Sequence, residues 1–172
     1  MNFEYKSTIP AHFHNQSRIW IYQSSRQFQI NESIEIERRL AGFVEQWNSH
    51  GVPVKGFSAL LFNQFIILVA DETNMGVSGC STDSSVRLIK EIEQMFNVNL
   101  FDRQMLAFII KDKVQLLPLG QLKYAADNHF ISANTLYFNN LIQTKLDFES
   151  NWIIPIKDSW LIKKVSFPES VS

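Results

Sequence analysis

The chain of 172 residues carries 16 basic and 17 acidic side chains, and its formal net charge of -1 lacks the basic excess typical of nucleic-acid-binding proteins. Hydrophobic residues make up 45% of it, which provides for a sizeable core and excludes disorder by composition. A single cysteine excludes a fold held by intramolecular disulfides. The length favours one domain over residues 1–172, with a core at about 18–117 and a C-terminal extension at about 118–172.

The N-terminal sequence shows no basic start followed by an apolar run, so no signal peptide is predicted. The longest apolar runs are Ala59–Phe62 and Phe65–Ala70. Both are far shorter than the roughly 20 residues of a membrane-spanning helix. We therefore expect a cytoplasmic protein without membrane insertion.

Residues 1–17 hold no regular period and are expected to be irregular. Arg18–Phe28 alternates between two faces and is predicted to be a strand. A helix should begin at Asn31–Ser33, where Asn and Ser can cap free amides. It should end near His50-Gly51, because glycine readily takes the left-handed conformation of a helix C-cap.

Two strands are predicted next, Val52–Phe62 and Phe65–Ala70, with a short turn at Asn63-Gln64 that suits a hairpin. The segment Asp71–Thr82 is rich in Ser, Gly and Asp and is expected to be a loop. A second helix is predicted from about Asp83 to Phe96, with apolar residues repeating on one face.

Further strands are predicted at Gln104–Ile110 and Val114–Leu117, and helices near Gly120–Asn128 and from Ser132 to about Phe148, before an extended stretch at Trp152–Val165. The order strand, helix, strand, strand, helix, strand is that of a ferredoxin-like βαββαβ unit. The predicted fold is therefore α+β, with a ferredoxin-like core, an antiparallel or mixed sheet and a helical C-terminal extension.

The segment Ser78–Ser85 is the most informative stretch for function, because it joins an apolar strand to a helix start. Free amides at a helix start can bind an anion, and its side-chain oxygens can assist. The predicted ligand-binding residues here are Ser78, Gly79, Ser81, Asp83, Ser84 and Ser85. The same helix end can favour a thiolate, so Cys80 is a candidate catalytic residue.

The alternative interpretation of this segment is purely structural. Ser81 and Asp83 are ordinary capping residues, and most single cysteines are inert. Asp83 also places negative charge near Cys80, which opposes thiolate formation. A nucleophilic cysteine needs a base, and no histidine lies near it in the sequence.

Arg26 is a second candidate ligand-binding residue, because it follows Ser24-Ser25 at a strand end and can contact a phosphate or carboxylate. It could equally pair with Glu32 or Asp102. Arg26 and the segment around Cys80 could share a pocket only if the strands that precede them run parallel.

Metal binding has little support in the sequence. His12-x-His14 lacks nearby residues to complete a ligand set, and Asp71-Glu72 is more often a solvated strand end than a cation site. No metal and no cofactor is therefore predicted.

Three stretches together carry a resemblance to a known family: Trp20–Arg26, Ser78–Val86 and Phe101–Arg103. In them the chain resembles a family of small uncharacterised bacterial proteins often labelled "ABC transporter ATPase". A P-loop ATPase needs Gly-x-x-x-x-Gly-Lys-Ser/Thr to hold phosphates, and no Gly-Lys-Ser or Gly-Lys-Thr occurs here. ATP hydrolysis by a P-loop mechanism is therefore rejected.

Three functions stay open. The first is a small cytosolic binding module that holds a small anionic ligand or a protein partner. The second is a thiol-dependent enzyme or redox sensor that uses Cys80. The third is a structural or interaction role for the aromatic-rich C-terminus. No oligomeric state is predicted.

Overall fold

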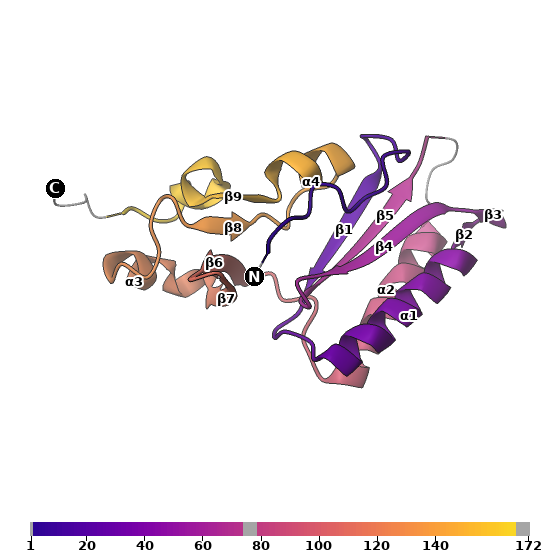
Figure 1. Cartoon of the computed structure of the whole chain (residues 1–172), viewed down its shortest axis with the longest axis horizontal. Coiled ribbons are helices and arrows are strands. Elements are labelled where there is room, and N and C mark those ends of the chain that lie inside the picture. Colours follow the sequence, from indigo (N-terminus) through magenta and orange to yellow (C-terminus); the bar gives the residue numbers. More distant parts are fainter. Residues whose placement is uncertain (1, 74–78, 168–172) are drawn as a thin grey trace. The chain divides into compact units, whose positions relative to one another are not determined.

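The computed structural model describes residues 2–73 and 79–167, and for residues 79–81 it describes the backbone alone. The chain forms two compact units, each built from segments far apart in the sequence. Among the described residues, the first unit comprises Phe3–Phe101 and Ile142–Ser150, and the second comprises Asn2, Asp102–Leu141 and residues 151–167. The fold is α+β, and its described part contains four α-helices and three small antiparallel sheets (Figure 1).

The first unit is organised around a three-stranded sheet of order β1-β5-β4. Its strands are β1 (Arg18–Gln23), β4 (Lys55–Leu61) and β5 (Phe65–Asp71), and both outer strands run antiparallel to β5. All seven residues of β5 are buried. A continuous apolar run belongs in the centre of a sheet, because both of its faces are covered.

Helix α1 (Ile30–Gln46) begins one residue before the predicted start. Gln29 is its N-cap and forms a capping box with Glu32, whose carboxylate accepts a hydrogen bond from the Gln29 amide at 2.8 Å. The helix ends before His50-Gly51, where the prediction placed its cap. Those two residues instead form the tight turn between β2 (Asn48–Ser49) and β3 (Val52–Pro53), both with positive φ.

Helix α2 (Gly79–Phe96) lies beside α1 on one face of the sheet (Figure 1). The helices and the sheet enclose one apolar core, because alternate residues of β5 face them. Its buried members are Phe28, Ile36, Leu40, Leu60, Ile66, Leu68, Leu88, Ile89, Ile92, Val98 and Leu100.

The opposite face of this sheet is covered by the N-terminal segment and by α4 (Lys145–Asn151). Tyr5 meets Phe148 edge to face with 5.2 Å between ring centroids, and Phe13 meets Phe57 at 6.1 Å. The prediction of irregular structure is confirmed for residues 2–17, and that segment nevertheless supplies core side chains.

The second unit contains a four-stranded antiparallel sheet of order β7-β6-β8-β9. The strands are β6 (Met105–Ile110), β7 (Lys113–Pro118), β8 (Leu136–Phe138) and β9 (Ile153–Pro155). The two strands of the β6–β7 hairpin were predicted, and in the structure Lys113 already belongs to β7, so that the turn consists of Lys111 and Asp112. Both turn residues have positive φ, as a turn that matches strand twist requires.

Short helices follow the strands of this unit. They are η1 (Leu119–Gln121), α3 (Leu122–Asp127), η2 (Ile156–Asp158) and η3 (Trp160–Lys163). With one face of the sheet they bury a second core. Its buried members are Leu106, Phe108, Leu122, Ala125, Ala126, Ile131, Tyr137, Ile156, Leu161 and Val165.

The ferredoxin-like arrangement is not present, although the α+β class is confirmed. In a ferredoxin-like unit the strand after the second helix returns to the first sheet. Here β6 pairs instead with β7 and β8 in another sheet. The outer edge of β1 is partly occupied by the returning chain, since the Ile19 amide donates to the Gln143 carbonyl at 3.0 Å and Arg18 bridges Thr144.

The predicted helix from Ser132 to about Phe148 is wrong. Leu136–Phe138 forms strand β8, which pairs with β6 and β9, and only the short helix α4 follows near the predicted end. Pairing with two neighbouring strands outweighs a local helical pattern. Among the described residues, no helix is long and apolar enough to cross a membrane.

Candidate functional site

The predicted ligand-binding segment lies at the start of α2, but most of it lies outside the described side chains. Ser78 falls outside the described residues, and Gly79, Cys80 and Ser81 are described by their backbone alone. Helix α2 begins at Gly79, so Cys80 belongs to its first turn. The predicted helix start at Asp83 is therefore four residues late.

The remaining residues of the segment lie along α2. Asp83 is exposed, Ser84 is half-buried, and Ser85 is fully buried. The Ser85 hydroxyl donates to the Thr82 carbonyl at 2.7 Å, a bond made back along its own helix. Ser85 is therefore committed to the helix and has no exposed oxygen for a ligand.

Arg26 forms a structural ion pair. Its guanidinium donates to both carboxylate oxygens of Glu32, at 2.8 and 2.9 Å, and to the Phe96 carbonyl at 2.8 Å. The hydrogen bonds to Arg26 hold the pKa of Glu32 below its ordinary value. Of the two predicted partners, Glu32 is the one observed.

Arg26 and Cys80 lie at opposite ends of α2. Arg26 binds the last residue of α2, whereas Cys80 is the second residue. At about 1.5 Å per residue these positions lie about 24 Å apart along the helix axis. The structure therefore does not bring the two together in one pocket.

Asp71 at the end of β5 is the centre of a buried hydrogen-bond cluster. Its carboxylate accepts from Lys55 Nζ at 2.8 Å, from the amides of Thr73 and His14 at 3.0 and 3.2 Å, and from the Thr73 hydroxyl. Burial by itself raises the pKa of Asp71, but these hydrogen bonds outweigh it and hold the pKa well below its ordinary value. The neighbouring Glu72 pairs with Arg18 at 3.5 Å. Asp71 and Glu72 are thus engaged by cationic side chains.

Metal ligands do not gather in the described part of the chain, where no group of three or more His, Cys, Asp or Glu residues is placed to hold an ion. His14 contributes to a local turn, since its Nδ1 accepts from the Gln16 amide at 3.1 Å.

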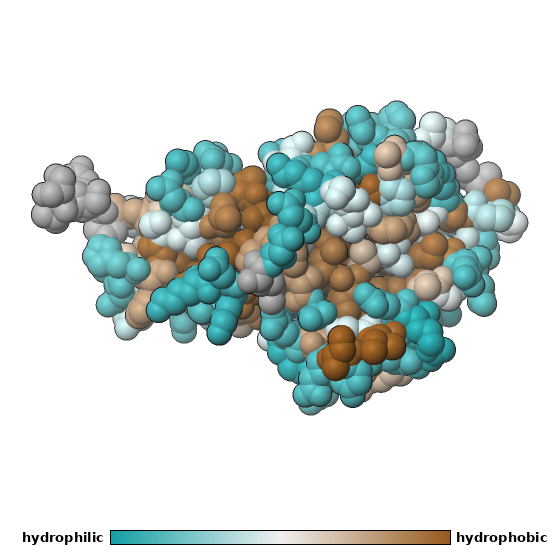
Figure 2. All heavy atoms as spheres, viewed as in Figure 1, coloured by the Kyte–Doolittle hydropathy of each residue, from teal (hydrophilic) through white to brown (hydrophobic). Residues whose placement is uncertain are grey.

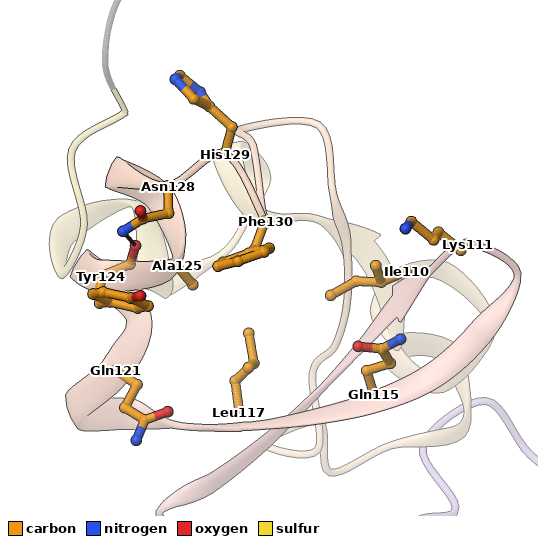
Figure 3. A pocket seen from close by; sticks show the side chains of 10 residues that line it. All are labelled: Ile110, Lys111, Gln115, Leu117, Gln121, Tyr124, Ala125, Asn128, His129 and Phe130. Carbon is orange, nitrogen blue, oxygen red and sulfur yellow. Dashed lines mark hydrogen bonds between the residues drawn. The ribbon is translucent and has the colours of Figure 1, made fainter.

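A pocket of about 620 Å³ lies entirely within the second unit (Figure 3). Volumes of this size are typical of small-molecule sites. The β6–β7 hairpin forms one wall, and η1, α3 and the turn after α3 form the other. The lining residues are Ile110, Lys111, Gln115, Leu117, Gln121, Tyr124, Ala125, Asn128, His129 and Phe130.

The lining divides into an apolar centre and a polar rim. Figure 3 shows Ile110, Leu117 and Phe130 converging on the hollow, with Ala125 behind them. Phe130 is 61% exposed, so its ring is largely open to solvent. Tyr124 lies beside it, with 6.4 Å between ring centroids and 35° between ring planes.

The position of Phe130 follows from the way in which α3 ends. His129 adopts φ of 58°, the left-handed conformation that usually falls to glycine after a helix. The Phe130 amide then donates to the Ala125 carbonyl at 2.9 Å, and the His129 amide donates to the Ala126 carbonyl at 3.1 Å. This termination turns the chain back over α3 and directs the Phe130 ring to the pocket, while the His129 imidazole points away from it (Figure 3).

The pocket lining carries basic side chains and no acidic ones. The basic residues are Lys111 and His129. Within residues 2–73 and 79–167, the Lys111 amine forms no ion pair or hydrogen bond with another side chain. The nearby Lys123, by contrast, is paired with Asp127 at 2.7 Å. An anionic group would therefore find a free cationic partner at the rim.

Sequence reasoning missed this pocket, because its lining comes from several elements and follows no spacing motif. One signal was present: Tyr124 and Phe130 are aromatic residues in a segment otherwise rich in polar residues. Exposed aromatic side chains are enriched at binding surfaces.

An exposed apolar pair also marks the first unit. Ile30 and Ile34 lie one turn apart at the beginning of α1 and are 74% and 61% exposed. Figure 2 shows brown atoms surrounded by hydrophilic teal side chains in the region where Figure 1 places the beginning of α1.

Comparison with protein-family models, with curated proteins and with solved structures finds no match to this chain.

Proposed function

We propose that this chain is a small cytoplasmic binding protein whose ligand site is the pocket between the β6–β7 hairpin and α3. The observation that carries the proposal is the exposed Phe130 ring at the centre of a hollow of about 620 Å³. Covering an exposed aromatic ring removes apolar surface from water, which stabilises a complex by about 25 cal/mol for each Å².

Binding is favoured over catalysis by the composition of the lining. It contains no serine, cysteine or carboxylate, and within the described residues the side chains of Lys111, Tyr124 and His129 form no hydrogen bond with one another that would join a nucleophile to a base. Its polar groups near the hollow are amides, a phenol and an amine, which can orient a ligand by hydrogen bonds. The anion site predicted at Ser78–Ser85 stays a proposal, as does the resemblance to the bacterial family labelled "ABC transporter ATPase".

The proposal is tested with the neutral fluorescent probe N-phenyl-1-naphthylamine. We expect saturable binding to the whole chain, and Phe130→Ala should weaken it about 2- to 13-fold, since an aromatic contact is worth about 0.5–1.5 kcal/mol beyond its buried area. Leu136→Ala is the matched control, because Leu136 is exposed in the same unit and does not line the pocket. Equal probe affinity of the wild-type and Phe130→Ala proteins would remove the proposal.

A second candidate is a thiol-dependent enzyme or redox sensor that uses Cys80. It is favoured by the start of α2 at Gly79, since a cysteine in the first turn of a helix experiences the positive end of the helix dipole. Alkylation by iodoacetamide is measured against pH. A half-maximal rate below about pH 8.5, the value for a free thiol, supports this candidate, whereas a value at or above it excludes it.

A further inference from the structure

We infer that the pocket beside Phe130 takes a planar aromatic molecule that carries a negatively charged group, such as a carboxylate or a sulfonate. This inference rests on the proposed binding function and names the chemical class of its ligand. The aromatic part would cover Phe130, and the anionic group would lie at Lys111.

The aromatic part follows from the shape and composition of the hollow. Phe130 offers an exposed ring, and the side chains of Leu117 and Ile110 converge on the same space (Figure 3). A flat ring can pack against Phe130 in an offset-stacked or edge-to-face arrangement and contact both aliphatic side chains. A volume of about 620 Å³ accommodates a ligand of one or two fused rings with a substituent.

The anionic group follows from the charges around the rim. Lys111 lies at the corner of the tight β6–β7 turn with φ of 52°, so its backbone is held by the hairpin register on either side. Its amine is exposed and has no carboxylate partner within the described residues, and the lining holds no acidic side chain to repel an anion. A cationic ligand would find no counter-charge among the lining residues.

The amides of the rim extend this recognition. Gln115 lies on β7 and lines the same pocket as Lys111 (Figure 3). Its amide nitrogen can donate a second hydrogen bond to an anionic oxygen. Asn128 is already committed, because its side-chain nitrogen donates to the Tyr124 carbonyl at 2.9 Å.

The test compares two probes that differ by one charge. 8-Anilinonaphthalene-1-sulfonate has the same aromatic body as N-phenyl-1-naphthylamine and adds a sulfonate. We expect the wild-type chain to bind the anionic probe about 2- to 5-fold more tightly than the neutral one, the range of a solvent-exposed ion pair. Raising the salt concentration to about 0.5 M should reduce this preference, because the pair is screened.

Lys111→Gln should abolish the preference for the anionic probe, so that the variant binds the two probes with equal affinity. Lys113→Gln is the matched control: it removes the same charge from the same hairpin, at an exposed residue that does not line the pocket. Thermal unfolding of each variant verifies that the fold is intact.

The outcomes separate the two proposals. Equal affinity for both probes, or equal effects of Lys111→Gln and Lys113→Gln, overturns the anionic class while Phe130-dependent binding of the neutral probe preserves the binding function. Binding of both probes that is insensitive to Phe130→Ala overturns the binding function itself.

Discussion

Asp71 and Lys55 pair across neighbouring strands of the first unit, with 2.8 Å between the Asp71 carboxylate and the Lys55 amine, and the Asp71 side chain is only 4% exposed. The Lys55 amine also donates to the His12 carbonyl at 2.8 Å and lies 5.0 Å from the centre of the Phe13 ring. The pair therefore ties the N-terminal segment to the edge of the sheet.

The Asp71 pair predicts a specific pH dependence of stability. The pKa of Asp71 is lowered in the folded chain from its ordinary value of about 3.8, because the hydrogen bonds it accepts outweigh the effect of burial. The ionised Asp71 carboxylate therefore makes its full contribution to the free energy of unfolding above that ordinary pKa. This contribution is lost as the pH falls below about 4. Since Lys55 is half-exposed and water screens the pair, Asp71→Asn should cost about 1–2 kcal/mol at neutral pH.

The measurement is the free energy of unfolding of the wild type and Asp71→Asn between neutral and strongly acid pH. The two curves should converge as the pH falls. Asp127→Asn removes an exposed carboxylate paired with Lys123 and should change stability by less than about 0.5 kcal/mol. Parallel curves for wild type and Asp71→Asn over the whole range would contradict the depressed pKa.

Alanine substitutions at two glycines of the first unit should change the free energy of unfolding in opposite directions. A Cβ at Gly56 would lie 2.8 Å from the Trp47 ring, which is buried and has no room to move. Gly56→Ala should therefore destabilise the chain by about 1–3 kcal/mol. Gly42→Ala in α1 meets nothing within 4 Å and should stabilise by about 0.5–1 kcal/mol, since alanine favours helices. Chemical denaturation checks both, and a loss of stability in both variants would refute the packing argument.

The ion pair of Arg26 predicts a structural effect without a functional one. Because Arg26 is partly exposed, Arg26→Gln should lower the free energy of unfolding by about 0.5–1 kcal/mol through the loss of its contacts with Glu32 and the Phe96 carbonyl. Its binding of N-phenyl-1-naphthylamine should equal that of the wild type. If the Arg26→Gln protein is folded but binds the probe more weakly, Arg26 takes part in ligand binding, and the purely structural role is wrong.

Local patterns predicted most elements of the chain. The alternation around Arg18, the apolar run Phe65–Ala70 and the two hairpins depend on residues close in sequence, and all are present. The sheet that each strand joins depends on distant partners instead. The ferredoxin-like arrangement was wrong for that reason, since β6 is paired on both edges within the second unit.

The site was harder to predict than the elements. For Arg26 the sequence offered two partners, Glu32 and Asp102, and the structure shows the pair with Glu32, which lies six residues later in α1. The pocket could not be found, because it depends on how the end of α3 turns at His129 and aims Phe130. A left-handed histidine leaves no recognisable sequence signature, since glycine is the usual residue there.

The left-handed conformation of His129 predicts a stabilising substitution. His129→Gly relieves the strain of a positive φ and should raise the free energy of unfolding by up to about 1 kcal/mol. Probe binding should persist, because the imidazole points away from the pocket (Figure 3). Thermal unfolding and probe titration check both parts, and a destabilised variant would show that the imidazole has a structural contact of its own.

The most direct test of the pocket is a titration with N-phenyl-1-naphthylamine followed by NMR. The changes in backbone amide chemical shifts then show which residues the probe contacts. The account predicts that the largest shifts fall on the lining residues from Ile110 to Phe130, and that Phe130→Ala reduces them. Shifts concentrated in the first unit, at α1 or at the described part of α2, would contradict a ligand site in this pocket.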